Sequence, residues 1–213
     1  MVEIREIESL PGGRIRLILE NGIRYTLLKS MLRERPLEVG QFVDEEEYAD
    51  WVLKHQYRSA LDKAVAMLAV RACSKGEIRE KLQRVGYSAE TIDMVLYKLE
   101  SNQLVNDQEF ADQWTQYRAG QNFGPRRIAM ELRRKGISEE EAGAALEELT
   151  GEQMLNQAVL LARKGLRRAK EGEDPRKLRQ RIFALLARRG YGWDLARQAL
   201  ETALKEQDET LEE

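Results

Sequence analysis

An apolar pattern with helical spacing occurs three times along the chain. In the first copy, Ile78, Leu82 and Gly86 follow one another at intervals of four residues. Residues four apart share one face of a helix, and a glycine after that face favours a left-handed helix end. The second copy starts at Ile128 and the third at Ile182. Each copy therefore predicts a helix with one buried face, which ends at a glycine and is followed by another helix.

The matching positions continue through that second helix. They are Ile78, Leu82, Gly86, Tyr87, Ile92, Val95, Leu96 and Leu99; then Ile128, Leu132, Gly136, Ile137, Ala142, Ala145, Leu146 and Leu149; then Ile182, Leu186, Gly190, Tyr191, Ala196, Ala199, Leu200 and Ala203. A repeat of about 50 residues is typical of modular proteins whose units bury apolar surface against their neighbours. Such proteins present long surfaces to extended partners, so the pattern favours binding over catalysis.

Each repeat is expected to contain three helices. Ser74 with Glu77, and Ser138 with Glu141, have the spacing of a capping box, which begins a helix. The predicted segments are a linking helix at 44–58, three-helix units at 59–104, 105–149 and 150–206, and an acidic tail at 207–213. Within the third unit, a helix over 151–170 and a loop over 171–174 are expected.

Residues 1–43 show a different periodicity and predict a small β-rich region. Apolar residues alternate over 15–19 and 23–27, on either side of Asn21-Gly22. Asn-Gly between alternating runs favours a hairpin with a type I′ turn. Pro11-Gly12-Gly13 indicates a second turn, so 2–7 is expected to add a strand. Residues 28–35 predict a short helix that Pro36 ends.

Composition limits the functional classes. The 213 residues are 42% apolar and 34% charged, with a net charge of −2, which argues against a general nucleic-acid binder. The single cysteine, Cys73, excludes a disulfide within the chain and suits a cytoplasmic protein. No apolar run is long enough to cross a bilayer, and the first residues lack the features of a signal peptide. A cytoplasmic monomer is expected.

Several strings with fixed spacing resemble those of one protein family. They are Arg71, Ser74, Glu77, Ile78, Leu82, Gly86 and Tyr87; Asn106, Asp107, Phe110, Ala111 and Arg118; Gly124, Arg127, Ile128, Glu131, Leu132, Lys135, Gly136 and Ile137; and Arg188, Arg189, Gly190 and Tyr191. Their order is similar to that of the RecX regulatory proteins, and the resemblance covers roughly residues 57–205. The N-terminal region matches only the longer members, and weakly.

The resemblance implies a curved, mainly α-helical array of three-helix repeats. It implies a modulator of the RecA recombinase that lies along the groove of the RecA–DNA filament. There it would limit filament extension and suppress strand exchange, ATP hydrolysis and co-protease function. It also implies some affinity for DNA and a role in homologous recombination, DNA repair and the SOS response. The sequence leaves the sign of regulation open, although inhibition is the expectation.

Basic residues gather in the C-terminal half of the chain. The candidates for contact with RecA or DNA are Arg126, Arg127, Arg133, Arg134, Lys135, Arg163, Lys164, Arg167, Arg168, Arg176, Lys177, Arg181, Arg188 and Arg189, with Lys170 and Arg179 in the same runs. On one face they would bind phosphates by counterion release. Because no base-reading motif is present, such binding should be independent of sequence. Any single cation could instead form a surface pair, such as Lys135 with Glu131.

The remaining motif residues are assigned structural roles: Arg71, Gly86, Asn106, Asp107, Phe110, Arg118, Gly136 and Gly190. Arg71 and Arg118 are expected to cap helix ends or to pair with Glu77 and Glu109, and Asn106-Asp107 to cap a helix. Phe110, Trp114 and Tyr117 share a helix face and are interpreted as core, with base stacking as the alternative.

Nothing in the sequence indicates an active site. His55 has no second histidine for a metal site, and Cys73 has no nearby base to activate it. The glycines of 120–124 lack the lysine of a phosphate-binding loop. We therefore expect no catalytic residue, metal or cofactor. The alternatives to a RecA regulator are a stand-alone DNA-binding protein, an enzyme, and a scaffold for another helical partner.

Overall fold

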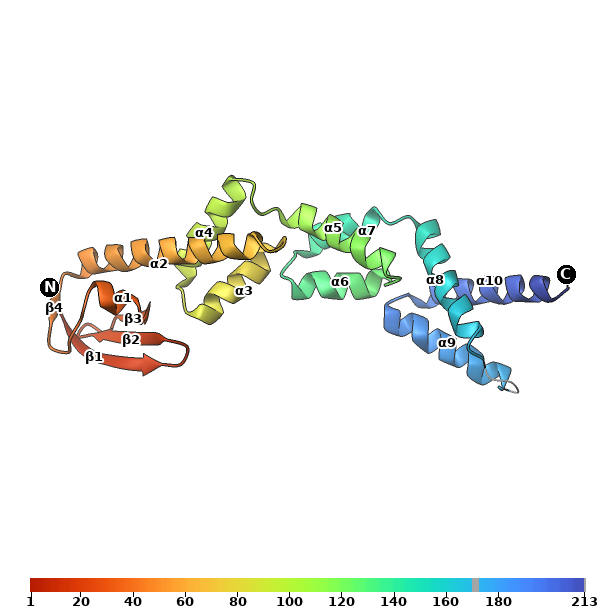
Figure 1. The fold of residues 1–213 in the computed structure, drawn as a ribbon, viewed down its shortest axis with the longest axis horizontal. Helices are drawn as coiled ribbons and strands as arrows, with labels where there is room; N and C mark the ends of the chain where they lie inside the picture. The colour runs from red at the N-terminus through yellow and green to blue at the C-terminus, as the bar shows by residue number, and fades with distance from the viewer. Residues whose placement is uncertain (170–172, 213) are drawn as a thin grey trace. The chain divides into compact units, whose positions relative to one another are not determined.

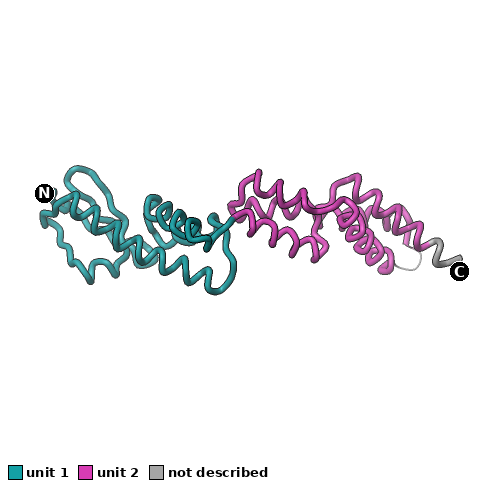
Figure 2. Tube along the Cα trace, turned by 90° about the horizontal axis from the view of Figure 1, so that it is seen from above, with its two compact units in different colours: residues 1–106 teal, residues 107–213 magenta. Residues whose placement is uncertain are grey.

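The computed structural model describes residues 1–169 and 173–212, without the side chains of 208–212. It divides into two compact units, residues 1–106 and 107–213 (Figures 1 and 2). The predicted fold class is confirmed, since three consecutive three-helix groups follow a small antiparallel sheet. The expected helix over 151–170 ends at Leu166, and part of the expected loop at 171–174 lies outside the described residues.

Unit 1 begins with a four-stranded antiparallel sheet of order β3-β2-β1-β4 (Figure 1). The strands are β1 (Val2–Leu10), β2 (Arg14–Leu19), β3 (Arg24–Leu28) and β4 (Phe42–Val43). Alternate residues of β2 are buried because one face of the sheet packs on a helix. A short helix, α1 (Met31–Glu34), follows β3 and ends before Pro36, as the sequence predicts.

The hairpin between β2 and β3 is confirmed, but its type I′ turn is wrong. A type I′ turn needs positive φ at both central residues. Gly22 has a φ of +85°, whereas Asn21 does not have positive φ. The amide of Gly22 donates to the carbonyl of Leu19 (2.9 Å), and the amide of Leu19 donates to the carbonyl of Ile23 (2.9 Å). This pattern is that of a turn followed by a glycine bulge, so the left-handed glycine alone is needed.

The first long helix is α2 (Glu45–Leu68), which Asp44 caps through the amide of Glu47 (3.0 Å). It is continuous, so the predicted boundary between 58 and 59 lies inside a helix. No proline or glycine interrupts the sequence from 45 to 68, and nothing local could end the helix earlier. One half of α2 packs on the sheet and the other half on the first repeat.

The buried side chain of Gln56 joins these two parts of unit 1. It is 2% exposed. Its amide group donates to the carbonyl of Thr26 in β3 (2.9 Å). Its oxygen accepts from the amide of Ser88 (3.1 Å) and from the hydroxyl of Thr91 (3.2 Å). No local sequence pattern identifies this residue, because its partners lie about 30 residues away on either side.

Replacing Gln56 with leucine is expected to destabilise unit 1 by about 2 kcal/mol, since several buried polar groups lose their partner. Urea denaturation followed by circular dichroism measures the effect. Gln83→Leu, at an exposed site on α3 (Lys75–Val85), is the matched control and should change stability by less than about 0.5 kcal/mol. Equal stability of the two variants would contradict the bridging role.

The repeated apolar positions form three separate cores. The first repeat contains the end of α2, α3 and α4 (Ala89–Ser101). Unit 2 contains α5 (Asp107–Gly120), α6 (Pro125–Arg134) and α7 (Glu139–Glu147), then α8 (Gly151–Leu166), α9 (Pro175–Arg189) and α10 (Trp193–Glu212). Ile78, Ile128 and Ile182 are fully buried, and so are the leucines four residues after each. α10 continues through most of the predicted tail.

Local signals at the helix ends are also confirmed. Ser74 with Glu77 and Ser138 with Glu141 form capping boxes. Gly86, Gly136 and Gly190 have φ values of +105°, +77° and +93° after α3, α6 and α9, a conformation that glycine adopts without steric cost.

Candidate nucleic-acid interface

Within unit 2, the end of α9 meets the start of α6 although they belong to different repeats (Figure 1). The amide of Gly124 donates to the carbonyl of Arg189 (2.8 Å), and the amide of Arg126 donates to the carbonyl of Gly190 (3.2 Å). The first amides of a helix and its last carbonyls lack partners within the helix. Gly124, the N-cap residue of α6, has no side chain to cap with, so the carbonyls of the other repeat replace that cap.

This α6–α9 junction is made by main-chain atoms at close range. A Cβ atom at residue 124 would lie 2.6 Å from the backbone of Gly190 and Tyr191. A Cβ atom at residue 190 would overlap Arg127. Both positions therefore exclude any side chain. The two helices also meet with complementary dipole ends, because the negative end of α9 faces the positive end of α6.

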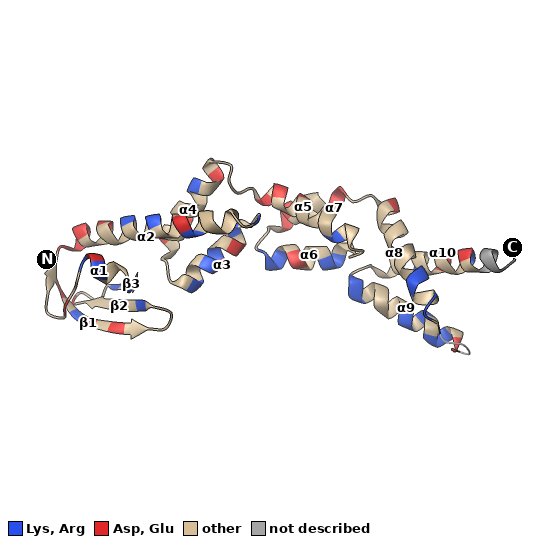
Figure 3. Cartoon of the chain, viewed as in Figure 1, with Lys and Arg blue, Asp and Glu red and all other residues tan. Residues whose placement is uncertain are grey.

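Exposed cations cover both helices of the junction and the end of α8, as Figure 3 shows in blue. We call this set the basic surface: Arg126, Arg133, Arg134, Lys164, Arg167, Arg168, Arg176, Lys177, Arg179, Arg181 and Arg188. Acidic residues instead gather on α5 and α7 (Figure 3). The charge of unit 2 is therefore polarised between helices, which the net charge of the whole chain conceals.

Among the described residues, most cations of the basic surface have no ion-pair partner. Arg133 pairs with Glu139 (3.2 Å), and Arg181 makes two hydrogen bonds to Glu173 (3.1 and 3.2 Å). The other cations of the surface form no ion pair with any residue that the structure describes. A surface of uncompensated Arg and Lys attracts polyanions, and its charge is balanced in solution by counterions that a phosphate backbone can displace.

Four of the predicted contact residues are used inside unit 2 instead. Arg127 donates to Glu131 (3.0 Å), and Arg163 pairs with Glu206. The ammonium of Lys135 lies 4.0 Å from the ring centre of Trp114. Arg189 donates to the carbonyl of Gln121 (3.2 Å) and lies over Phe123. Lys170 lies outside the described residues.

Arg118 organises a buried charge network at the core of the second repeat. It donates to both oxygens of Glu131, from Nε at 2.7 Å and from Nη2 at 2.6 Å, and lies over the ring of Phe123. The two charged side chains are 16% and 13% exposed. The predicted pairing of Arg118 with Glu109 is therefore wrong. Glu131 is one helical turn beyond Arg127 on α6, which places it between two guanidinium groups.

The network changes the titration of its carboxylate. Burial raises the pKa of Glu131, but hydrogen bonds from Arg118 and Arg127 outweigh it, so the pKa lies below its ordinary value. Around Arg71 the expected pairing with Glu77 is confirmed, through hydrogen bonds of 2.9 and 3.1 Å. That carboxylate raises the pKa of Arg71.

The aromatic residues of α5 divide between core and surface. Phe110 is buried and stacks on Trp114, with 6.1 Å between ring centres and 7° between planes. Tyr117 is 58% exposed, so its assignment to the core is wrong. Asn106 directly precedes α5, at the position of an N-cap, and the side chain of Asp107 is buried.

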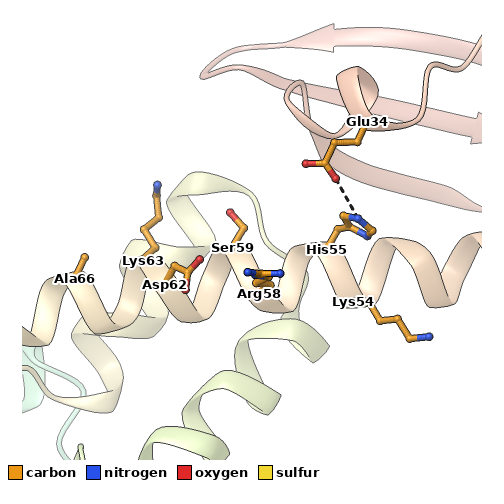
Figure 4. Close-up of a pocket in the computed structure, with 8 residues that line it drawn as sticks. All are labelled: Glu34, Lys54, His55, Arg58, Ser59, Asp62, Lys63 and Ala66. Carbon is orange, nitrogen blue, oxygen red and sulfur yellow. Dashed lines mark ion pairs between the residues drawn. The ribbon is translucent and has the colours of Figure 1, made fainter.

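A polar depression on α2 in unit 1 contains His55 (Figure 4). Nε2 of His55 lies 3.1 Å from a carboxylate oxygen of Glu34, and Nδ1 lies 2.8 Å from the carbonyl of Trp51. The hydroxyl of Ser59 pairs with that of Tyr87 (2.7 Å) rather than with the imidazole. The arrangement connects α1 to α2 and lacks the nucleophile–base hydrogen bond of a covalent catalyst.

Two further properties concern only residues 1–169 and 173–212. There, His, Cys, Asp and Glu form no group of three that could hold a metal ion. No helix in that part of the chain combines the length and apolar character needed to cross a membrane.

Comparisons with known families agree on all three repeats. Residues 60–99, 106–146 and 152–200 match models described as the first, second and third three-helix domains of RecX. A regulatory protein RecX from Amycolatopsis mediterranei is 36% identical over 154 residues, covering 72% of this chain and 87% of the relative. One from Listeria monocytogenes is 30% identical over 196 residues, covering 92% of this chain and 72% of the relative.

Two crystal structures share the fold. One, of a regulatory protein RecX, has a TM-score of 0.63 at 24% identity and covers 94% of this chain and 100% of the other. The other, of RecX from Lactobacillus salivarius, has a TM-score of 0.65 at 22% identity and covers 70% of this chain and 97% of the other.

Proposed function

Because this chain belongs to the RecX family of regulatory proteins, we propose that it binds the filament of RecA on DNA and inhibits the recombinase, ATPase and co-protease activities of RecA. The observation that supports this proposal is the basic surface on α6, α8 and α9, whose cations are largely unpaired among the described residues. The protein acts as a cytoplasmic monomer without catalysis of its own.

The basic surface contacts phosphates of the filament DNA or acidic residues of RecA. Most of its cations are held on α6, α8 and α9, and Arg167 and Arg168 directly follow α8, so binding does not require a disordered segment to fold. The contacts are electrostatic and do not read bases, in keeping with a sequence in which no base-reading motif was found. The bulk of the repeats then blocks addition of RecA subunits and access of substrate DNA.

The direct test is the ATPase rate of RecA on single-stranded DNA, with this protein added below the concentration of RecA. We expect the rate to fall and electron microscopy to show the protein on filaments. An unchanged rate together with bare filaments would overturn the proposal. Tight, salt-sensitive binding to DNA alone, with no effect on RecA, would support the stand-alone DNA-binding protein instead.

Removing charge from the basic surface tests its role. The variant replaces Arg134, Arg167, Arg168 and Arg188 with alanine. We expect at least about tenfold weaker binding to DNA or to the filament. The slope of the logarithm of the binding constant against the logarithm of the salt concentration should become less steep by about 0.7 to 0.9 for each lost phosphate contact. Binding is measured by fluorescence anisotropy at several salt concentrations.

The matched control removes the same charge from unit 1, at the exposed residues Lys54, Lys63, Lys81 and Lys98. It should retain most of the affinity, since only the charge of the whole protein changes. Equal losses in the two variants would show that net charge, and not the basic surface, determines binding.

A further inference from the structure

An apolar groove runs between α9 and α10 in the third repeat. It has a volume of about 620 Å³. Phe183 lines it from α9, while Trp193, Leu200 and Leu204 line it from α10. Trp193 and Leu200 are about two helical turns apart, and Leu204 lies one turn further along α10. The three side chains therefore form one stripe about 17 Å long.

Trp193 is the unusual residue of this groove. Its side chain is 64% exposed, although its ring lies only 4.4 Å from that of Phe183, measured between centres. Tryptophan is costly to leave in water and is among the residues that contribute most to protein interfaces. Leu200 below it is 6% exposed and belongs to the core. Buried Leu200 therefore forms the floor of the groove, and the exposed side chain of Trp193 lies at one end of it.

The charges around the groove are unequal. Arg176, Lys177 and Arg179 line it on the α9 side, and none of their side chains forms an ion pair with a residue that the structure describes. On the α10 side, Arg197 and Glu201 lie 3.9 Å apart and largely balance each other. An occupant that covers the apolar stripe would thus meet uncompensated positive charge along one edge only.

We propose that this groove binds an amphipathic helix of a partner protein, with leucine- or phenylalanine-type side chains on one face and carboxylates along the edge that faces α9. Apolar anchors at helical spacing fit a straight stripe between two helices. The leucines favour a protein over a nucleic acid, because bases stack on aromatic rings but gain little from aliphatic side chains.

The probe is a synthetic amphipathic peptide of four helical turns, with leucines on one face and glutamates flanking it. Binding is followed by the indole N–H signals of Trp51, Trp114 and Trp193 in NMR spectra of the full chain, with Trp193→Phe to assign the last. We expect the signal of Trp193 to shift on titration and the other two to stay. Trp193→Ala should weaken binding at least about tenfold.

Charge reversal distinguishes specific binding in the groove from nonspecific association with the peptide. Arg176→Glu with Arg179→Glu should weaken the glutamate peptide about tenfold and strengthen a lysine version of the same peptide. Lys54→Glu with Lys63→Glu, at exposed sites in unit 1 that do not line the groove, is the matched control and should leave both affinities nearly unchanged. A peptide of scrambled order with the same composition should not shift the Trp193 signal.

Three outcomes would overturn this inference. They are a shift of the Trp193 signal by the scrambled peptide as large as by the original, a larger shift by oligothymidylate than by the peptide, and a concentration-dependent shift without any ligand, which would indicate a second copy of the chain. The experiment contains neither RecA nor a filament. Its failure therefore leaves the proposed function intact, and the reverse also holds.

Discussion

Replacing Gly124 with alanine is expected to lower the free energy of unfolding of unit 2 by about 3 kcal/mol. The φ of Gly124 is −83°, which alanine adopts without strain. The whole effect therefore comes from the added methyl group, which would lie 2.6 Å from the backbone of Gly190 and Tyr191. Because its neighbours are main-chain atoms, they cannot rotate away as a side chain would. The α6–α9 junction must open, and its two hydrogen bonds weaken.

Urea denaturation of the full chain, with hydrogen exchange of the peptides from α6 and α9, measures this loss. Gly143→Ala is the control, since it makes the same chemical change in α7, where no atom beyond the adjacent backbone of the helix lies within 4 Å of the new Cβ. That variant should become more stable by about 0.5 to 1 kcal/mol, because alanine favours a helix. Unchanged exchange at α6 and α9 in Gly124→Ala would contradict the close contact.

Replacing Glu131 with glutamine is expected to destabilise unit 2 by about 2 kcal/mol at neutral pH. The change leaves the guanidinium of Arg118 mostly buried without a carboxylate, a loss of 3 to 5 kcal/mol for fully buried pairs. We expect less here because Arg127, the other partner, is 39% exposed and can be solvated. Glu139→Gln is the control: its partner Arg133 is 75% exposed, so the loss should be below about 0.5 kcal/mol.

The pH dependence of that difference has a definite sign. The pKa of Glu131 is lower in the folded protein than its ordinary value of 4.5. Its contribution to stability is therefore complete above about pH 4.5 and is lost as the pH falls through the folded pKa. Stability measured from neutral to acid pH should show the wild type approaching Glu131→Gln at the acid end. A constant difference across that range would argue against ionisation of Glu131 as its source.

Local features of the fold could be predicted from the sequence because their causes are local. Ser74 and Gly86 begin and end α3 through contacts within a few residues of themselves. The burial of Ile78 follows from spacing along a single helix. Gln56 could not be predicted in the same way, since its polar partners come from the sheet and from α4.

The candidate interface was predictable in composition but not in detail. Runs of Arg and Lys identified α6, α8 and α9, yet a run does not show which of its members face inward. Arg127 is held by Glu131, one turn further along the same helix. Arg189 is oriented by the loop after α5, which only the packed structure brings within reach. Choosing Glu109 for Arg118 failed for the same reason, since sequence distance is a poor guide when two helices pack.

The hydrogen bonds from Gly124 and Arg126 to the end of α9 fix the distance between two helices without using any side chain. Surface residues on either helix can therefore change in evolution while the distance between their charged groups stays the same. Substitutions of single surface residues would then change the affinity for a polyanion, while the distance between the charges on α6 and those on α9 stays matched to the repeating phosphates.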